Sequence, residues 1–228
     1  MCSSDLDAYA ALARRAIAAV DLTLDLSTTR LVVEVPATEA DLDRALGARP
    51  GTYAGIAAVT APVDGATTAT APVHVFVNPG QFDRLRPQGA QVVMTHETTH
   101  AATHAVTSRA PLWLVEGFAD WVALQAVPLP VSTTARELIA QVRRDGPPRT
   151  LPTRAEFGVQ SETLDATYEA SWQACRLLSE RFGDTALRRL YDLTSAGTPF
   201  GPTLRRLTGL TLADFTAAWR TRLAGLVP

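Results

Sequence analysis

The chain has 228 residues, of which 46% are hydrophobic and 19% are charged, a balance typical of a folded protein and not of a disordered one. The formal net charge is −2, so the composition offers no basic surface for nucleic acid or an anionic membrane. No stretch reaches the roughly 18 apolar residues that span a bilayer. All 21 basic residues are Arg, which excludes chemistry that depends on Lys, such as a Schiff base or a P-loop.

The first third of the chain predicts a small mixed sheet accompanied by helices. Residues 6–20 are rich in Ala and Leu and predict a helix. Thr38 predicts the N-cap of a second helix, which ends at Gly47. Strands are predicted at 31–35, 53–60 and 73–78, with a turn-rich hairpin loop at 61–72.

From residue 88 onward the sequence predicts helices almost exclusively. Asp184 and Thr211 are the expected N-caps of two late helices. The expected helices are 88–107, 111–127, 133–145, 162–182, 184–196, 200–208 and 211–225. This order predicts an α+β fold in one domain, 1–228, with an N-terminal α/β part (1–87) and a helical part (88–228).

Two cysteines, Cys2 and Cys175, provide neither a disulfide framework nor a cysteine zinc site. Cys2 is followed by two Ser residues, as in the lipidated first residue of a bacterial surface lipoprotein whose signal segment has been removed. The alternative is an ordinary exposed residue near a terminus. The two interpretations predict an extracytoplasmic lipoprotein with a lipid anchor at Cys2 or a cytoplasmic protein.

Residues 96–100 read His-Glu-Thr-Thr-His, an HExxH motif within a largely apolar predicted helix. Positions i and i+4 share one helical face, so His96 and His100 can bind the same Zn²⁺ ion. Glu97 is adjacent and can act as the general base toward a water molecule that zinc has made more acidic. Because buried imidazoles need partners, the apolar flanks argue against two surface histidines.

A third ligand is expected from the next predicted helix, since a catalytic zinc site takes three protein ligands and leaves one position open. Glu116 stands there among apolar residues, where an unpaired carboxylate is costly. Asp120 follows by four residues and can accept a hydrogen bond from a ligating imidazole, which fixes its tautomer.

The motif HETTH, then fifteen residues, then EGFAD resembles the gluzincin branch of zinc metallopeptidases, which are thermolysin-like. The segments VNP (77–79), PLWLVEGFADW (111–121), TYEASWQACRLL (167–178) and GTPFGPTLRRLTGLTLADFTAAWR (197–220) resemble its bacterial peptidase-MA-like group. The resemblance covers residues from about 73 to 225 and implies a zincin-like fold.

Carried over to this chain, the resemblance implies that His96, His100 and Glu116 bind zinc, that Glu97 is the general base and that Asp120 orients His96. It also implies that the hydroxyl of Tyr168 stabilises the oxyanion. The alternatives are that Tyr168 belongs to the core, or that Tyr191 supplies the hydroxyl.

The two remaining histidines are not expected to bind zinc. His104 lies eight residues after His96, about 12 Å along a straight helix, and no Gly turns the chain between them. We expect His104 to pack or to lie on the surface, and His74, at a strand start, to be structural.

The expected function is therefore a zinc-dependent peptidase whose partner is a peptide or protein substrate. Two alternatives from other classes are a zinc-holding scaffold without turnover and a peptide-binding module of the bacterial cell envelope. A substrate peptide would pair with the edge of the sheet, at Tyr53–Thr60 or at His74–Asn78. The sequence does not choose between these segments, and it leaves the oligomeric state open.

Overall fold

The computed structural model describes residues 3–27, 29–63, 66, 71–125, 127, 129–158 and 161–227. It confirms the predicted α+β fold, with a small mixed sheet in the N-terminal part and helices in the C-terminal part. The chain forms two compact units, one of Met1–Thr107 with Val122–Val127 and one of Ser108–Trp121 with Pro128–Pro228. The predicted single catalytic domain stays a prediction, and Cys2 lies outside the described residues.

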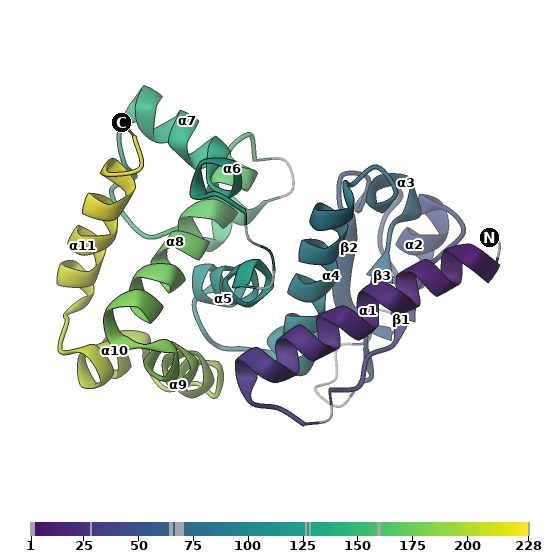
Figure 1. Ribbon diagram of the computed structural model, residues 1–228, viewed down its shortest axis with the longest axis horizontal. Coiled ribbons are helices and arrows are strands. Elements are labelled where there is room, and N and C mark those ends of the chain that lie inside the picture. Colours follow the sequence, from purple (N-terminus) through teal and green to yellow (C-terminus); the bar gives the residue numbers. More distant parts are fainter. Residues whose placement is uncertain are drawn as a thin grey trace. The chain divides into compact units, whose positions relative to one another are not determined.

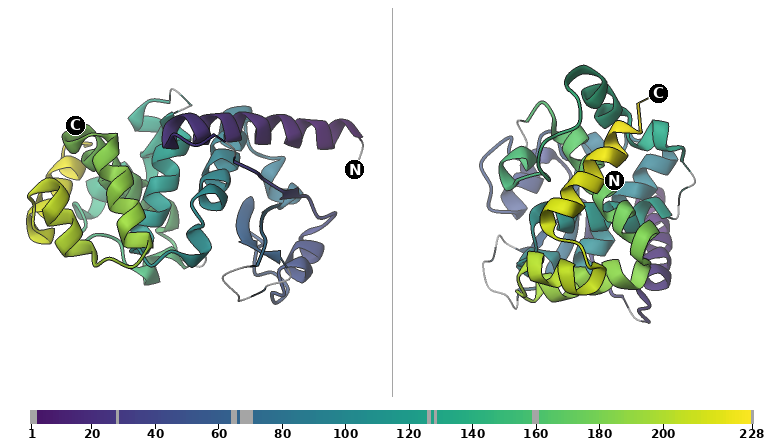
Figure 2. Two further views of the ribbon diagram at one scale, coloured as in Figure 1. Left: turned by 90° about the horizontal axis from the view of Figure 1, so that it is seen from below. Right: turned by 90° about the vertical axis from the view of Figure 1, so that its left-hand side faces the viewer.

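The first unit contains the sheet (Figure 1). Strand β3 is central, pairing in parallel with β1 and antiparallel with β2. Helix α1 is a single uninterrupted helix (Figure 2) and packs along α4. The elements of this unit are α1 (Ser3–Leu24), β1 (Val33–Glu34), α2 (Glu39–Ala45), β2 (Ala58–Pro62), β3 (Val73–Val77), α3 (Pro79–Phe82), α4 (Pro87–Ala102) and the 3₁₀ helix η2 (Ala105–Thr107).

The two faces of the sheet bury different helices, because side chains alternate along a strand. Val75 and Val77 of β3 belong to a core cluster with Met94 of α4 and residues of α1. Phe76, between them, packs with Leu42 of α2 in a second cluster. Helix α4 is therefore fixed against one face of the sheet, and it carries the HExxH motif.

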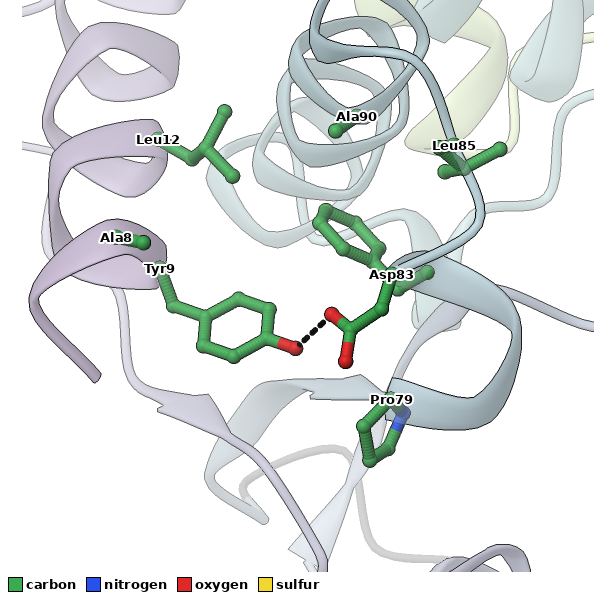
Figure 3. Close-up of a pocket in the computed structure, with 8 residues that line it drawn as sticks. Ala8, Tyr9, Leu12, Pro79, Asp83, Leu85 and Ala90 are labelled. Carbon is green, nitrogen blue, oxygen red and sulfur yellow. Dashed lines mark hydrogen bonds between the residues drawn. The ribbon is translucent and has the colours of Figure 1, made fainter. Parts of the chain in front are cut away.

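A pocket lies between α1 and the segment that runs from α3 into α4 (Figure 3). Tyr9 and Phe82 contribute its aromatic side chains, 5.6 Å between ring centroids. The Tyr9 hydroxyl donates a hydrogen bond to Asp83 Oδ1 at 2.6 Å. This contact joins α1 to the residue that follows α3.

The second unit is helical and is built around α8 (Figure 1). Helices α7, α9 and α11 all pack against α8, which buries Cys175 and Leu178. The elements of this unit are α6 (Val131–Thr134), α7 (Arg136–Asp145), the 3₁₀ helix η3 (Arg154–Phe157), α8 (Leu164–Phe182), α9 (Asp184–Ser195), α10 (Phe200–Thr208) and α11 (Leu212–Ala224).

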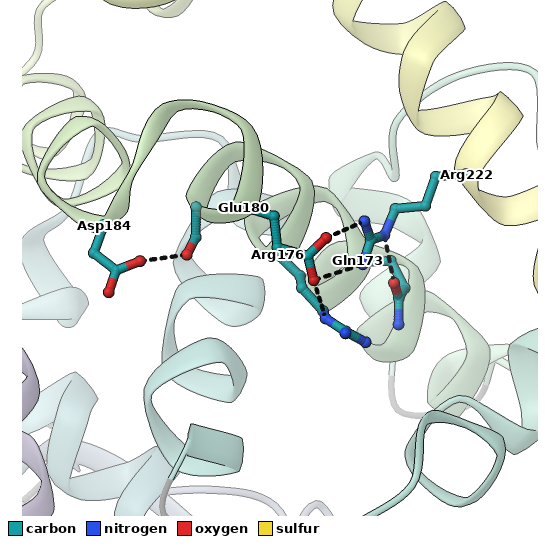
Figure 4. Close-up of polar contacts among 6 residues, drawn as sticks. Gln173, Arg176, Glu180, Asp184 and Arg222 are labelled. Atoms are coloured by element: carbon teal, nitrogen blue, oxygen red, sulfur yellow. Dashed lines mark hydrogen bonds and ion pairs between the residues drawn. The ribbon is translucent and has the colours of Figure 1, made fainter.

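A polar network connects α8 to α11 (Figure 4). Arg222 of α11 donates through Nε to Gln173 Oε1 at 2.8 Å and through Nη1 to Glu180 Oε2 at 2.7 Å. Arg176, one turn before Glu180 on α8, adds an ion pair at 2.6 Å. The hydrogen bond from Arg222 is the main reason that the pKa of Glu180 lies below its ordinary value.

Helix α5 (Leu112–Gln125) has residues in both units: up to Trp121 it belongs to the second unit, and from Val122 it belongs to the first. Its contact with α8 is unusually close at Gly117, where a Cβ atom would lie 2.3 Å from the main-chain oxygen of Ser171. Only Gly permits this approach of two helix backbones.

Several predicted boundaries are wrong. The helix expected at 88–107 ends at Ala102, and His104 adopts a left-handed backbone with φ of 53° before η2 begins. The helix expected at 133–145 is two helices, separated at Ala135. The N-cap of α9 is Gly183 and not the expected Asp184, which is the first residue of the helix. Thr211 is confirmed as an N-cap, in a capping box with Asp214.

The predicted strand 53–60 is also wrong in its first half, since β2 begins at Ala58. Residues 50–55 form turns instead. The buried carboxylate of Asp43 accepts hydrogen bonds from the main-chain N–H groups of Gly51, at 2.7 Å, and Tyr53, at 3.2 Å. Within the described part of the chain, no helix combines the length and the apolar character that crossing a membrane requires.

Candidate metal and catalytic site

The two histidines of the HExxH motif lie one turn apart on α4. Their Nε2 atoms are 2.8 Å apart, and their rings are perpendicular to within a few degrees, at 84°. The ring of His100 is buried and that of His96 is half-buried. The local cause is the helical repeat, which stacks positions i and i+4 on one face, so both nitrogens point at one small volume.

Glu116 of α5 completes a group of three possible ligands. One ligand atom from each of His96, His100 and Glu116 lies within 4.8 Å of the other two. Two imidazole nitrogens with one carboxylate oxygen suit zinc and related divalent transition metals. These residues can therefore hold a metal ion, and the donor set fits the cofactor that the sequence predicts.

Glu97 follows His96 on α4, and its side chain is buried, with 8% of its surface exposed. The hydroxyl of Thr60, on β2, lies 2.7 Å from Glu97 Oε2 and 2.9 Å from the main-chain oxygen of Glu97. Thr60 is not among the site residues predicted from the sequence. Its one signal is a polar side chain in an otherwise apolar strand, and nothing in that signal says which helix the strand faces.

Asp120 lies one turn after Glu116 on α5 and is half-buried. Burial in the core raises the pKa of the Cys175 thiol on α8 well above its ordinary value, and the negative charge of Asp120 raises it further. Asp120 is therefore close enough to α8 to act on its buried thiol electrostatically.

The two candidate hydroxyls differ in their surroundings. Tyr168 of α8 is half-buried and meets Phe157 edge to face, 5.3 Å between ring centroids. Tyr191 of α9 is 2% exposed and stacks on Phe118 of α5 at 4.2 Å. The ring of Tyr191 is thus part of the core of the second unit, whereas that of Tyr168 is partly exposed.

The remaining histidines lie elsewhere. His104 is exposed, two residues beyond the end of α4. His74 of β3 has its Nδ1 atom 2.6 Å from Glu34 Oε1 of β1, so it connects two paired strands.

Comparison with known proteins gives a match to a protein family. The family model BSP, described as a peptidase of plants and bacteria, matches residues 66–136. The match spans α4 and α5, hence the HExxH motif and Glu116, but less than half of the chain. It supports a peptidase family without pointing to the gluzincin branch in particular. No curated protein and no solved structure gives a significant match.

Proposed function

We propose that this chain is a zinc-dependent, gluzincin-like peptidase that hydrolyses peptide bonds with Glu97 as general base. The observation that carries the proposal is the group of His96, His100 and Glu116 with the buried carboxylate of Glu97 next to it in sequence. The match to a peptidase family over the same segment supports the peptidase part of the proposal.

Zinc is the proposed ion because two imidazoles and one carboxylate are a common protein ligand set of catalytic zinc, which keeps a further position open. When bound, Zn²⁺ supplies Lewis acidity toward the scissile carbonyl and makes a water molecule acidic enough to lose a proton near neutral pH. The half-buried position of His96 and Glu116 is compatible with substrate access.

The residues of the chain would divide the remaining work. Glu97 takes a proton from the attacking water and returns it to the leaving amine. The Tyr168 hydroxyl donates a hydrogen bond to the oxyanion as negative charge develops there. Asp120 would accept a hydrogen bond from His96 and hold its ring in the ligating orientation, which makes it a positioning residue.

The sheet order supports β2 as the strand that would pair with a peptide substrate. Strand β3, one of the two candidate segments, has a partner on each side. Strand β2 is an edge strand and packs beside α4, so its outer edge offers main-chain hydrogen bonds near the HExxH helix.

The proposal is tested by metal analysis together with digestion of casein. We expect about one zinc per chain, proteolysis that a chelator abolishes, and a Glu97→Gln variant that keeps zinc but loses activity by a factor of at least about 10³. His100→Ala should lose the metal, and His104→Ala, a matched exposed histidine, should keep both metal and activity.

Each alternative predicts a different outcome. Activity that persists without metal, or in Glu97→Gln, would contradict the mechanism. A zinc-bound chain that is inert toward every peptide substrate would instead favour the scaffold or the peptide-binding module.

A further inference from the structure

We infer that Thr60 is a positioning residue for Glu97: its hydroxyl holds one oxygen of the carboxylate so that the other faces the water to be deprotonated. The inference deepens the proposed function and rests on Glu97 being the base. Its evidence is the pair of contacts from Thr60 Oγ1, 2.7 Å to Glu97 Oε2 and 2.9 Å to the Glu97 main-chain oxygen.

Both acceptors belong to Glu97, so Thr60 is hydrogen-bonded to this residue whichever acceptor it uses. We call this contact the tether between Thr60 and Glu97. A hydroxyl has one proton to donate, and here it can donate to the carboxylate, to the main-chain oxygen or to both in part. In every case the hydrogen bond connects residue 97 of α4 to residue 60 of β2. Thr60 gains and loses no proton in this role.

The strand holds Thr60 in place. Thr60 is paired with Val75 of β3, and Val75 lies on the face of the sheet that packs against Met94 of α4. A β-branched side chain in a strand has restricted χ1 rotamers, so the direction of the hydroxyl is largely set before any substrate arrives. Both residues lie in the first unit, so this arrangement belongs to one compact part of the chain.

The geometry leaves a specific task for the other carboxylate oxygen. With Oε2 hydrogen-bonded to Thr60, rotation of the carboxylate is restricted, and Oε1 remains for proton transfer. A carboxylate that is already held in the productive orientation loses less conformational entropy when the transition state forms. Removal of the hydroxyl should therefore reduce turnover without changing how tightly metal or substrate binds.

The test uses the full chain loaded with zinc and compares Thr60→Val with Thr60→Ser. Valine is nearly isosteric but lacks the hydroxyl, and serine retains it. We expect kcat to fall about 10- to 100-fold in Thr60→Val with KM and zinc content unchanged, and to return to within a few fold of wild type in Thr60→Ser. If Thr60→Val fails to fold by circular dichroism, Thr60→Ala replaces it.

Thr98→Val is the matched control. Thr98 is buried, whereas Thr60 is half-buried, and Thr98 lies next to Glu97, but its hydroxyl donates to the main-chain oxygen of Met94, at 2.7 Å. Loss of this hydroxyl should leave kcat unchanged. A full kcat in Thr60→Val, or a Thr60→Ser variant as slow as Thr60→Val, would overturn the inference.

A second measurement needs no activity. In the metal-free protein, we measure the change in the free energy of unfolding caused by Thr60→Val, by Glu97→Ala and by both together. The change in the double variant should differ from the sum of the two single changes, because the two residues are in direct contact. Additive shifts would overturn the inference. A wild-type chain that binds zinc but cleaves nothing would refute the proposed function and with it the positioning of a base by Thr60. Non-additive changes would in that case still show that Thr60 and Glu97 are coupled.

Discussion

At the scale of single residues, the surroundings of the two tyrosines allow their proposed roles to be separated. Tyr168→Phe removes the proposed oxyanion donor, and we expect kcat to fall about 10²- to 10³-fold with little change in KM. Tyr191→Phe, a change in a ring already enclosed by the core, should alter kcat by less than about threefold. Steady-state kinetics on a peptide substrate measures kcat and KM of both variants. A larger fall in kcat for Tyr191→Phe than for Tyr168→Phe would assign the oxyanion donor to Tyr191.

The candidate ligands could be predicted from the sequence because their chemistry is encoded locally. The i, i+4 spacing places His96 and His100 on one helical face whatever the rest of the fold does. Glu116 was predicted from a carboxylate in an apolar helix. Thr60 could not be predicted, because its contact with Glu97 depends on which face of a strand packs against which helix.

At the scale of elements, Gly117 controls how closely α5 can approach α8. A Cβ atom there would clash with the Ser171 main-chain oxygen, so Gly117→Ala must move one helix. We expect a net loss in the free energy of unfolding, because the clash costs about 1–3 kcal/mol or more and the gain in helix propensity offsets at most about 1 kcal/mol of it. Zinc content should fall as well, since Glu116 is the adjacent residue.

Gly201→Ala provides the control for Gly117→Ala. Gly201 is also helical, in α10, and a Cβ atom there would have nothing within 4 Å. This substitution should be neutral or stabilise the protein by up to about 1 kcal/mol. Urea denaturation of both variants decides the matter, and equal stabilities would refute the close approach of α5 and α8.

A second prediction at this scale concerns Glu169 of α8, which accepts a hydrogen bond from the main-chain N–H of Leu138 in α7, at 2.6 Å. Burial raises the pKa of Glu169 to about 7, despite the opposing effect of the main-chain hydrogen bonds. Because the pKa is higher in the folded than in the unfolded state, the stability contribution is complete below about pH 4.5 and is lost as pH rises through about 7.

Glu169→Gln should remove this dependence, since the amide oxygen can still accept the hydrogen bond from Leu138. Relative to the variant, wild type should lose about 1–2 kcal/mol between about pH 5 and pH 8, a value reduced to allow for solvent screening. Chemical denaturation at both pH values measures the difference. Glu162→Gln, at an exposed position, is the control for the loss of a carboxylate as such.

Element boundaries were predicted less well than the elements, for reasons outside local sequence. The residues after Ala102 have helix-compatible side chains, yet His104 turns into a left-handed conformation. The turn at residues 50–55 is stabilised by Asp43, a residue from another element. The contacts of Asp43 come from outside the segment and override the local periodicity on which the strand prediction at 53–60 rested.

At the scale of the whole molecule, metal removal should lower stability, because an ion that binds only the folded chain stabilises it by mass action. With zinc at about 100 times its dissociation constant, the gain is about 2.7 kcal/mol. For a chain of this size we expect a chelator to lower Tm by about 5–10 °C. Calorimetry with chelator and then with excess zinc should show a reversible shift that is absent in His100→Ala. An unchanged Tm in wild type would argue against a bound metal.

The buried thiol of Cys175 has a practical consequence. Alkylating reagents attack the thiolate form of cysteine. While α8 is packed, Cys175 is protected because its raised pKa leaves little thiolate and because its side chain is buried. In a Cys2→Ser background, the rate at which Cys175 is alkylated under native conditions therefore reports how often the helical unit opens transiently. Mass spectrometry measures this rate.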